Sequence, residues 1–327
     1  MKKALICGVS GQDGAYLAQF LIEKGYQVWG TSRDAQVANF GNLSILGIRD
    51  EVNLLSMEQT DFRSVLNSLN FSDPDEVYFL SGQSSVGLSF DQPAETIESF
   101  TLGVLNLLEA IRFIGKPIRI YHASSSECFG DVGQQRATED TPFHPRSPYG
   151  VAKASAHWLV TNYRESYNLF ACNGILFNHE SPLRPARFVT RKIVSAACRI
   201  SRGAVEKLHL GRLDIVRDWG WAPEYVEVMW RMLQAEAPED FVIATGSSVS
   251  LEEFVAKAFE SVKLDWRDFV VSDATFFRPS DIAHSTADPS KVARELNWSA
   301  TTQLPELVQK LMNAELEKVG HINHKEY

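Results

Sequence analysis

The first half of the chain alternates short apolar runs with longer amphipathic runs, and no other feature of the sequence constrains the fold as strongly. This alternation is typical of βαβ units, in which each strand of a parallel sheet is followed by a helix that packs against it. The expected strands and helices cover residues 4–7, 16–24, 27–31, 52–55, 62–69, 77–80, 94–114, 118–122, 148–167 and 171–176. We therefore expect an α/β fold with a doubly wound parallel sheet and helices on both faces.

The pattern changes after about residue 177, where glycine, proline and basic residues become frequent. With 327 residues and 44% hydrophobic content, the chain can build one large domain or two closely associated domains. We assign residues 1–176 and a returning segment of about 215–243 to the first domain. A smaller mixed α/β domain is expected from about 177–214 and 244–320, and residues 321–327 are expected to form a polar tail.

A glycine-rich turn, Gly8-Val-Ser-Gly11-Gln-Asp-Gly14, follows the first expected strand and opens the first helix. Glycines there allow a tight turn and a close approach to a pyrophosphate, which the helix N-terminus attracts. The spacing differs from the commoner Gly-x-Gly-x-x-Gly, so a plain βα turn remains an alternative, but the position favours a Rossmann-type dinucleotide site. The residues expected to bind the cofactor are Gly8, Ser10, Gly11, Gln12, Asp13 and Gly14.

The end of the second strand indicates which dinucleotide binds. A carboxylate at this place usually binds the ribose 2′-hydroxyl of NAD, whereas the chain has Gly30-Thr-Ser-Arg33-Asp34. We therefore predict NADP, with Arg33 on the 2′-phosphate, while the adjacent Asp34 leaves NAD open.

Tyr149 and Lys153 are four residues apart and therefore lie on the same face of a helix. An ammonium near a phenol favours the phenolate and lowers the tyrosine pKa, which makes Tyr149 a candidate general base. Ser147 suits an N-cap and Pro148 suits the first helical position. The alternative is an aromatic ring packed under the stem of a solvated lysine.

Charge and composition exclude several classes of function. The net charge of −9 argues against a nucleic-acid-binding surface. Within 184–217, however, nine lysines and arginines oppose two acids, which favours an anion site such as one for a diphosphate over a solvated helix face.

Four scattered cysteines and dispersed histidines suggest neither disulfides nor a metal site. The apolar run after the N-terminal lysines is short and interrupted by glycine, and no stretch of the chain is long enough to span a membrane. We expect a cytoplasmic protein without metal or membrane partners.

Several longer motifs resemble the extended short-chain dehydrogenase/reductase superfamily and, more narrowly, the GDP-mannose 4,6-dehydratase family. The resemblance covers about residues 3–308. Its motifs are Gly8/Gly11/Gly14, Gln83-Ser-Ser-Val-Gly87, Ser124-Ser-Ser-Glu127, Pro145-Arg-Ser-Pro-Tyr-Gly-Val-Ala-Lys153, Asn162-Tyr-Arg-Glu-Ser-Tyr167, Gly174-Ile-Leu-Phe-Asn-His-Glu-Ser-Pro182, Phe188-Val-Thr-Arg-Lys192, Arg217-Asp-Trp-Gly220 and Phe277-Arg-Pro279.

The resemblance implies a hydro-lyase that converts GDP-mannose to GDP-4-keto-6-deoxymannose through NADP, a step toward the deoxysugars of surface polysaccharides. It implies that Ser125, Glu127, Tyr149 and Lys153 are catalytic, and Glu127 separates a dehydratase from an epimerase or a reductase. Further cofactor contacts implied by the family are Glu58, Leu80, Ser84, Tyr149, Lys153, Leu176, Asn178 and His179. The implied substrate contacts are Ser85, Ser125, Glu127, Asn178, Val189, Lys192, Arg217 and Arg278.

The chain departs from the family pattern at three places. Residues 34–42 replace an arginine- and serine-rich segment that reaches a neighbouring subunit, which leaves a homodimer built on helices 94–114 and 148–167 as the first expectation and a homotetramer as the second. Glu58 replaces an aspartate that contacts adenine. Changes at 184–187 and Trp221 fall where the sugar pocket is expected, so a GDP-heptose is an alternative substrate, with a C4 epimerase or a non-catalytic NADP-binding protein as further alternatives.

Overall fold

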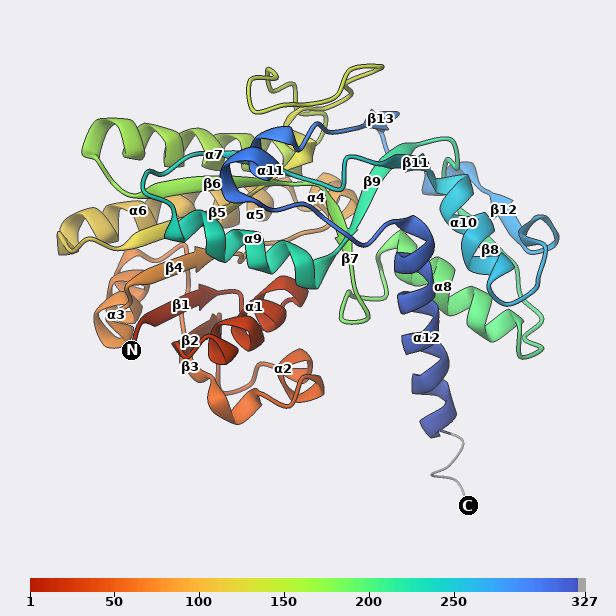
Figure 1. The fold of residues 1–327 in the computed structure, drawn as a ribbon, viewed down its shortest axis with the longest axis horizontal. Helices are drawn as coiled ribbons and strands as arrows, with labels where there is room; N and C mark the ends of the chain where they lie inside the picture. The colour runs from red at the N-terminus through yellow and green to blue at the C-terminus, as the bar shows by residue number, and fades with distance from the viewer. Residues whose placement is uncertain (323–327) are drawn as a thin grey trace.

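The computed structural model describes residues 1–322, and within this range a parallel seven-stranded sheet forms the centre of the larger part of the molecule (Figure 1). The chain order of the strands reverses between β1 and β4, which places a crevice at their carboxyl ends. The strands lie in the order β3 (Asn53–Ser56), β2 (Gln27–Ser32), β1 (Lys3–Cys7), β4 (Glu76–Phe79), β5 (Arg119–Ser125), β6 (Ala171–Leu176) and β10 (Phe241–Ile243).

Alternate residues of β1 face separate hydrophobic cores on the two sides of the sheet. Ala4 and Ile6 face one core, while Leu5 and Cys7 face the other. The first core is covered by α1 (Gln12–Glu23), α2 (Gly41–Ile45), α9 (Ala222–Gln234) and α11 (Ser290–Leu296). The second is covered by α3 (Phe62–Ser72), α6 (Gly103–Ile114) and α7 (Pro148–Tyr167). The predicted doubly wound α/β fold is confirmed.

A smaller part of the molecule lies beside the carboxyl end of the central sheet (Figure 1). Its strand β9 (Val216–Trp221) pairs with β7 (Asn178–Glu180), β11 (Ser248–Ser250) and β13 (His284–Ser285). A further pair joins β8 (Leu208–Leu210) to β12 (Val270–Ser272). The helices α8 (Val189–Ile200), α10 (Leu251–Glu260) and α12 (Leu304–Ile322) enclose its separate core.

The long helix expected over 94–114 differs from the helix observed. The structure forms α5 (Pro93–Ile97), then a π-helical turn over Glu98–Leu102, and then α6. The apolar spacing does not reveal the turn, because one extra residue shifts the helix face without changing its composition. A short α4 (Val86–Asp91) precedes this region.

The structure also divides the chain somewhat differently from the predicted partition. Within the returning segment 215–243, α9 and β10 pack with the central sheet, whereas β9 pairs with strands of the smaller part. Helix α11, predicted in the second domain, packs against α9 and β10. Residues 321 and 322 continue α12 instead of forming a tail, and 323–327 lie outside the described residues.

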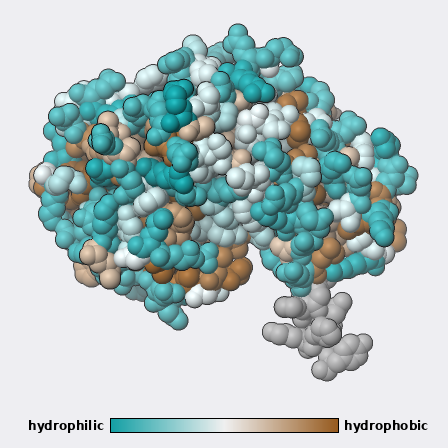
Figure 2. Space-filling view, in the orientation of Figure 1, coloured by the Kyte–Doolittle hydropathy of each residue, from teal (hydrophilic) through white to brown (hydrophobic). Residues whose placement is uncertain are grey.

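The surface of the molecule and the state of its cysteines can be compared with what the composition suggests. On the face drawn in Figure 2, hydrophilic side chains cover most of the surface and hydrophobic side chains form separate patches. In residues 1–322 all four cysteines are buried and free. None of the helices in that range combines the length and apolar composition needed to span a bilayer. The described His, Cys, Asp and Glu residues form no group of three or more that could hold a metal ion.

Candidate active site

A cavity of about 1050 Å³ begins at the carboxyl ends of the central strands and extends to residues of the smaller part. It lies at the reversal of strand order, where open α/β sheets bind their ligands. Both the glycine-rich turn after β1 and the Leu80–Ser85 segment after β4 line it, together with residues of β7, α8 and β9. Ligands in this cavity therefore contact both parts of the molecule.

The glycine-rich turn has the shape that a dinucleotide pyrophosphate requires. Gly8 has a φ of +87°, and a Cβ there would lie 2.9 Å from the backbone of Ser81. A Cβ at Gly14 would collide with the backbone of Gly8. Helix α1 begins directly after Gly11, so its first backbone N–H groups point into the cavity end that the glycines leave open. This part of the site fits a dinucleotide.

His179 ties the glycine-rich turn to β7. Its Nε2 lies 2.9 Å from Oδ2 of Asp13, and its Nδ1 lies 2.7 Å from the carbonyl oxygen of Phe177. Both partners are acceptors, so this pair of contacts favours the protonated imidazole, in which both ring nitrogens donate. Burial alone would lower the pKa of His179, but the charge and hydrogen bond of Asp13 outweigh burial and raise it. Nearby, Ser181 Oγ donates to Gln12 Oε1 at 2.7 Å.

Arg33 stands at the cavity end where the second strand finishes, and its side chain is largely exposed. Its guanidinium lies 3.6 Å from a carboxylate oxygen of Glu58 and 3.7 Å from one of Glu95. Glu58 also accepts hydrogen bonds from the backbone N–H and hydroxyl of Thr60. Asp61 caps α3 by accepting from the N–H of Arg63. Two acids therefore share the cation that the sequence assigns to a 2′-phosphate.

The predicted proton-transfer residues meet at the ends of β5 and α7. Ser125 ends β5, Glu127 lies in the single 3₁₀ turn that follows, and Tyr149 and Lys153 lie on the first turns of α7. Ser147 caps this helix, as predicted, by accepting a 3.0 Å hydrogen bond from the N–H of Gly150.

Burial governs how Tyr149 and Lys153 titrate. Burial raises the pKa of Tyr149, and hydrogen bonding by Ser125 offsets only part of this rise. Burial lowers the pKa of Lys153 to about 7. The expected lowering of the tyrosine pKa by the ammonium is therefore wrong for this arrangement. Burial destabilises the phenolate by more than the neighbouring groups stabilise it.

Glu127 is a carboxyl group in the same cavity. Burial raises its pKa, against the lowering influence of the positive charges of Arg278 and Arg217. Arg217 is 5% exposed, and its guanidinium donates to the carbonyl oxygens of Val216 and Ile282 at 2.8 and 2.7 Å. An arginine fixed in this way is oriented before any ligand arrives.

Every residue predicted from the sequence to contact cofactor or substrate lines this one cavity. The cofactor set is Gly8, Ser10, Gly11, Gln12, Asp13, Gly14, Arg33, Glu58, Leu80, Ser84, Tyr149, Lys153, Leu176, Asn178 and His179. The substrate set is Ser85, Ser125, Glu127, Asn178, Val189, Lys192, Arg217 and Arg278. Their shared location is an observation, and their roles remain predictions.

The basic stretch 184–217 divides between two purposes. Arg191 pairs with Glu315 at 2.7 Å and Arg199 pairs with Glu206 at 2.9 Å, so these two arginines form ion pairs within the smaller part. The members that line the cavity are Arg184, Arg187, Lys192, Arg212 and Arg217. Roughly half of the basic residues in this stretch therefore line the cavity, where their charges favour an anion.

Some residues of the cavity carry no signal in the sequence. Gln59, Ser81, His209 and Phe276 all line it, yet none belongs to a recognisable pattern. Gln59 is placed by its 2.9 Å hydrogen bond to the carbonyl oxygen of Ser99, which only the folded chain reveals. Conversely, Trp221, expected near the sugar, stays outside the described cavity lining and packs under the ammonium of Lys310.

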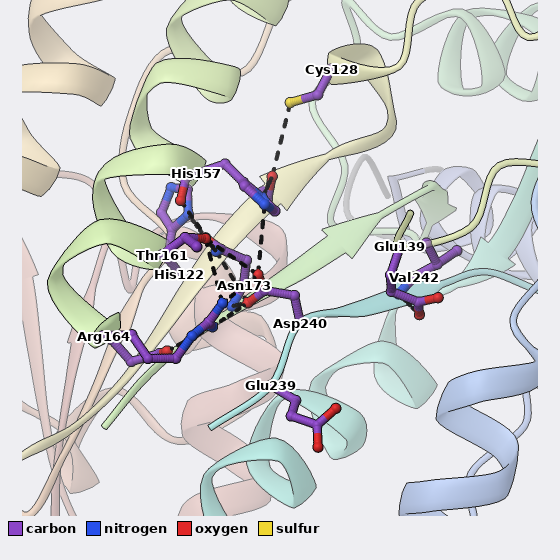
Figure 3. Close-up of polar contacts among 12 residues, drawn as sticks. His122, Cys128, Glu139, His157, Thr161, Arg164, Asn173, Glu239, Asp240 and Val242 are labelled. Atoms are coloured by element: carbon purple, nitrogen blue, oxygen red, sulfur yellow. Dashed lines mark hydrogen bonds and ion pairs between the residues drawn. The ribbon is translucent and has the colours of Figure 1, made fainter. Parts of the chain in front are cut away.

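A polar network joins α7 to β5, β6 and the segment before β10 (Figure 3). Arg164 of α7 donates to both oxygens of Asp240, at 2.7 and 3.0 Å. Asp240 also accepts from the backbone N–H of Asn173 at 2.7 Å. His157, one turn beyond Lys153, lies 3.1 Å from the hydroxyl of Ser124. This network fixes α7 against the strand that carries Ser125.

Comparisons with known proteins agree with this geometry. Residues 5–311 match the sequence model of a family described as GDP-mannose 4,6 dehydratase. The relative GDP-mannose 4,6 dehydratase 1 of Arabidopsis thaliana is 44% identical over 326 residues, covering 97% of this chain and 90% of that protein.

Solved structures share the fold at lower sequence identity. The dTDP-glucose 4,6-dehydratase DesIV of Streptomyces venezuelae, with NAD and TYD bound, has a TM-score of 0.86 at 20% identity and covers 98% of each chain. RMD from Pseudomonas aeruginosa, complexed with NADPH, has a TM-score of 0.78 at 20% identity and covers 97% of this chain and 98% of that one. Because the sequence match spans nearly the whole chain and its motifs meet at the cavity, the chain belongs to the GDP-mannose 4,6-dehydratase family.

Proposed function

We propose that this chain converts GDP-mannose to GDP-4-keto-6-deoxymannose with loss of one water. Its family consists of enzymes that dehydrate nucleotide sugars. The observation that carries the proposal is the position of Glu127, a buried carboxyl group next to Ser125 in the cavity that Tyr149 and Lys153 also line. A reductase or an epimerase has no step that needs this carboxyl group.

The site fits a nicotinamide dinucleotide, and NADP is the form we propose. The glycine-rich turn and the start of α1 would hold the pyrophosphate, and Arg33 would hold the 2′-phosphate. A bound nicotinamide supplies the hydride acceptor for C4 and the hydride donor for C6 of the sugar.

The first chemical task of the protein is a proton transfer at C4. Tyr149 takes the proton of the C4 hydroxyl as C4 becomes a ketone. Ser125, which hydrogen-bonds the phenol, orients it, and the ammonium of Lys153 stabilises the phenolate as it forms. Since burial raises the pKa of Tyr149, the phenolate needs both partners.

The second task is elimination across C5 and C6. The ketone at C4 acidifies the C5 hydrogen, so a carboxylate can remove it as a proton. Glu127 takes this proton and delivers a proton to the C6 hydroxyl, which leaves as water. Burial raises the pKa of Glu127, which strengthens the carboxylate as a base. Return of hydride to C6 would require uptake of one proton at C5, which balances the proton that Tyr149 took from the C4 hydroxyl, so the net change is loss of water.

The basic end of the cavity is suited to the GDP moiety. Lys192, Arg217 and Arg278 line this end, and their charges complement a diphosphate. Ser85 and Asn178 line the same cavity and are the further residues that we propose to contact the substrate. The diphosphate would anchor the substrate and leave the sugar next to Glu127.

We also propose that the chain forms a homodimer through α6 and α7. Phe113, Trp158 and Tyr167 on these helices are 75%, 58% and 47% exposed, and Val151 is 48% exposed. Large apolar side chains at this exposure on adjacent helices are typical of an interface.

The test is to incubate the purified protein with GDP-mannose, with and without NADP, and to follow the nucleotide sugar by mass spectrometry. A product lighter by one water in the wild type, and its absence in Glu127→Gln, is the expected result. No loss of water from GDP-mannose despite bound NADP would contradict the substrate assignment. Parallel incubation with a GDP-heptose would then distinguish another substrate from a non-catalytic protein.

A further inference from the structure

Phe100 lies at the point where the helix after β4 changes its winding. The π-helical turn Glu98–Leu102 separates α5 from α6, and Phe100 at its centre is 2% exposed. Such turns insert one extra residue into a helix and are frequent at functional sites. The turn directs the Phe100 ring toward α7, away from the apolar stripe that α6 presents to the second core.

The ring of Phe100 contacts both members of the proposed proton-transfer pair. The Lys153 ammonium lies 4.0 Å from the centroid of the ring. The Tyr149 ring meets Phe100 edge-on, with centroids 5.4 Å apart and an interplanar angle of 89°. A cation over a ring face is attracted by the negative charge of that face, and an edge-on contact suits a second ring.

Lys153 has few other partners. Among residues 1–322, the carbonyl oxygen of Ala123, at 2.7 Å, is the one hydrogen-bond acceptor of its ammonium. Burial lowers the pKa of Lys153 to about 7. The charged form of this lysine therefore depends on weak, oriented interactions.

The other titrating groups near Lys153 supply little compensating charge. Burial raises the pKa of Cys128, in the turn after β5, to about 12, so it stays a thiol. Burial lowers the pKa of His122 on β5 to about 3, so it stays neutral. Tyr149 on the same helix has a raised pKa, and Asp13 at the start of α1 contributes a weak attraction through space. Two ring faces also approach the ammonium, and that of Phe100, at 4.0 Å, lies closer than that of Tyr149, at 5.9 Å.

Gly82 makes room for the ring. It has a φ of +131°, and a Cβ at this position would collide with the Phe100 ring. The segment that carries Gly82 also carries Ser84 and Ser85, which line the cavity. Phe100 thus fills the space between this segment and α7.

We propose that Phe100 is a positioning residue whose ring face holds Lys153 as an ammonium beside Tyr149. The inference rests on the proposed function, because it concerns the proton that Tyr149 removes from C4. Phe100 itself exchanges no proton and lies outside the cavity lining, so its effect passes through Lys153. Removing the ring face, while keeping an apolar side chain of similar size, is expected to favour the neutral amine.

The experiment compares the wild type with two changes at position 100. Phe100→Leu removes the ring, and a trifluorinated phenylalanine at position 100 keeps the shape while withdrawing charge from the ring face. Phe259→Leu is the matched control, because Phe259 is a buried ring stacked on Phe269 in the core of the smaller part. Lys153 is titrated by NMR in protein labelled at lysine Cε and Nζ, with Lys153→Arg assigning its signal.

The expected result is a fall in the Lys153 pKa of about half a unit to one unit in both position-100 variants, which corresponds to about 0.7–1.4 kcal/mol. The kcat of GDP-mannose dehydration at pH 8 should fall about 3- to 10-fold, as the ammonium fraction does, with KM changed less than about 2-fold. The alkaline limb of the pH–rate profile should move to lower pH. The Phe259→Leu control should leave the titration and the profile in place.

An unchanged Lys153 titration in the fluorinated variant would overturn the proposal, even if Phe100→Leu were slow, since packing alone would then explain the loss. The titration does not depend on turnover. If the wild type fails to dehydrate GDP-mannose, the proposed function fails, while the NMR comparison still decides the role of Phe100.

Discussion

At the scale of single residues, the titrating groups of the site are governed by how far the fold removes them from water. Glu127 and Tyr149 have raised pKa values and Lys153 has a lowered one, and in each case burial is the largest cause. Each shift favours the neutral form. The shifts of Glu127 and Lys153 move their pKa values toward neutral pH, whereas the shift of Tyr149 moves its pKa further away, so its phenolate needs stabilising neighbours.

Glu127→Gln should abolish dehydration and stabilise the fold. We expect kcat to fall by about 10²–10⁴-fold, the usual contribution of general acid–base catalysis. Because the folded pKa of Glu127 lies above its ordinary value of 4.5, the wild type loses stability as pH rises through that folded pKa.

The glutamine variant lacks this loss, so its Tm should exceed that of the wild type at pH 8 and match it near pH 4. Thermal unfolding at several pH values checks this outcome. A lower Tm for the variant at pH 8 would show that the ionised carboxylate stabilises the fold.

Arg33→Ala should change which cofactor binds. Loss of the guanidinium removes a charge-assisted contact to a 2′-phosphate, so we expect the Kd for NADP to rise about 10-fold or more. The Kd for NAD should change little, because NAD lacks that phosphate. Fluorescence titration of the reduced forms measures both constants, with Arg267→Ala, an exposed arginine of the smaller part, as the control. Equal losses for the two cofactors would contradict the assignment of NADP.

The residues of the site were predictable from the sequence, whereas their electrostatic states were not. Ser125, Glu127, Tyr149 and Lys153 stand in motifs that can be read directly, and all line the cavity. The direction of the Tyr149 shift was predicted wrongly, because sequence spacing reports the nearby lysine but not the degree of burial. Phe100 carried no signal for the same reason.

At the scale of elements, α7 is the part of the fold that carries most of the proposed proton-transfer residues. It carries Tyr149, Lys153 and His157 in three successive turns, and Arg164 two turns further on. Its start was predicted to the residue, since Ser147 and Pro148 are strong start signals, whereas the π-helical turn before α6 has no comparable signal. The residues that start and stop a helix act through their immediate neighbours in the sequence. A π-helical turn depends on tertiary contacts, which the local sequence does not show.

Asp240→Asn should loosen α7 and destabilise the protein. Burial would raise the pKa of Asp240, but the hydrogen bonds and charge of Arg164 outweigh it and lower the pKa. The carboxylate therefore stabilises the fold above its ordinary pKa of 3.8, and this contribution is lost as pH falls through the lowered value. Removing one partner of such a pair costs about 3 kcal/mol.

Urea unfolding at pH 7 measures this loss, and the difference from the wild type should shrink in acid. Glu236→Gln, an exposed change nearby, is the control and should leave the free energy of unfolding within about 0.5 kcal/mol. An equally stable Asp240→Asn protein would show that the ion pair is replaceable.

At the scale of the whole molecule, the exposed apolar side chains of α6 and α7 predict association. Trp158→Glu places a charge on this surface and should convert a dimer to a monomer in sedimentation velocity. Val205→Glu, on a fully exposed loop of the smaller part, should have no such effect. A wild type that sediments only as a monomer at micromolar concentration would remove the dimer proposal.

The doubly wound sheet was predictable because each of its βαβ units is encoded locally, and the family motifs extended the prediction to the cavity. The assignment of β9 and α11 to one part or the other was not, because these segments are short and pack with residues far away in the chain. Long-range pairing leaves little trace in a single sequence.

The path of the backbone limits how the cavity can open. After β6 the chain enters the smaller part, returns for α9 and β10, leaves again, and comes back for α11 before ending in α12. Several backbone connections therefore join the two parts, instead of a single hinge. A wide movement of one part relative to the other would strain all of these connections at once, so ligands should enter and leave by small local movements of the cavity rim. For the same reason, cutting the chain once with a protease should leave the two parts connected.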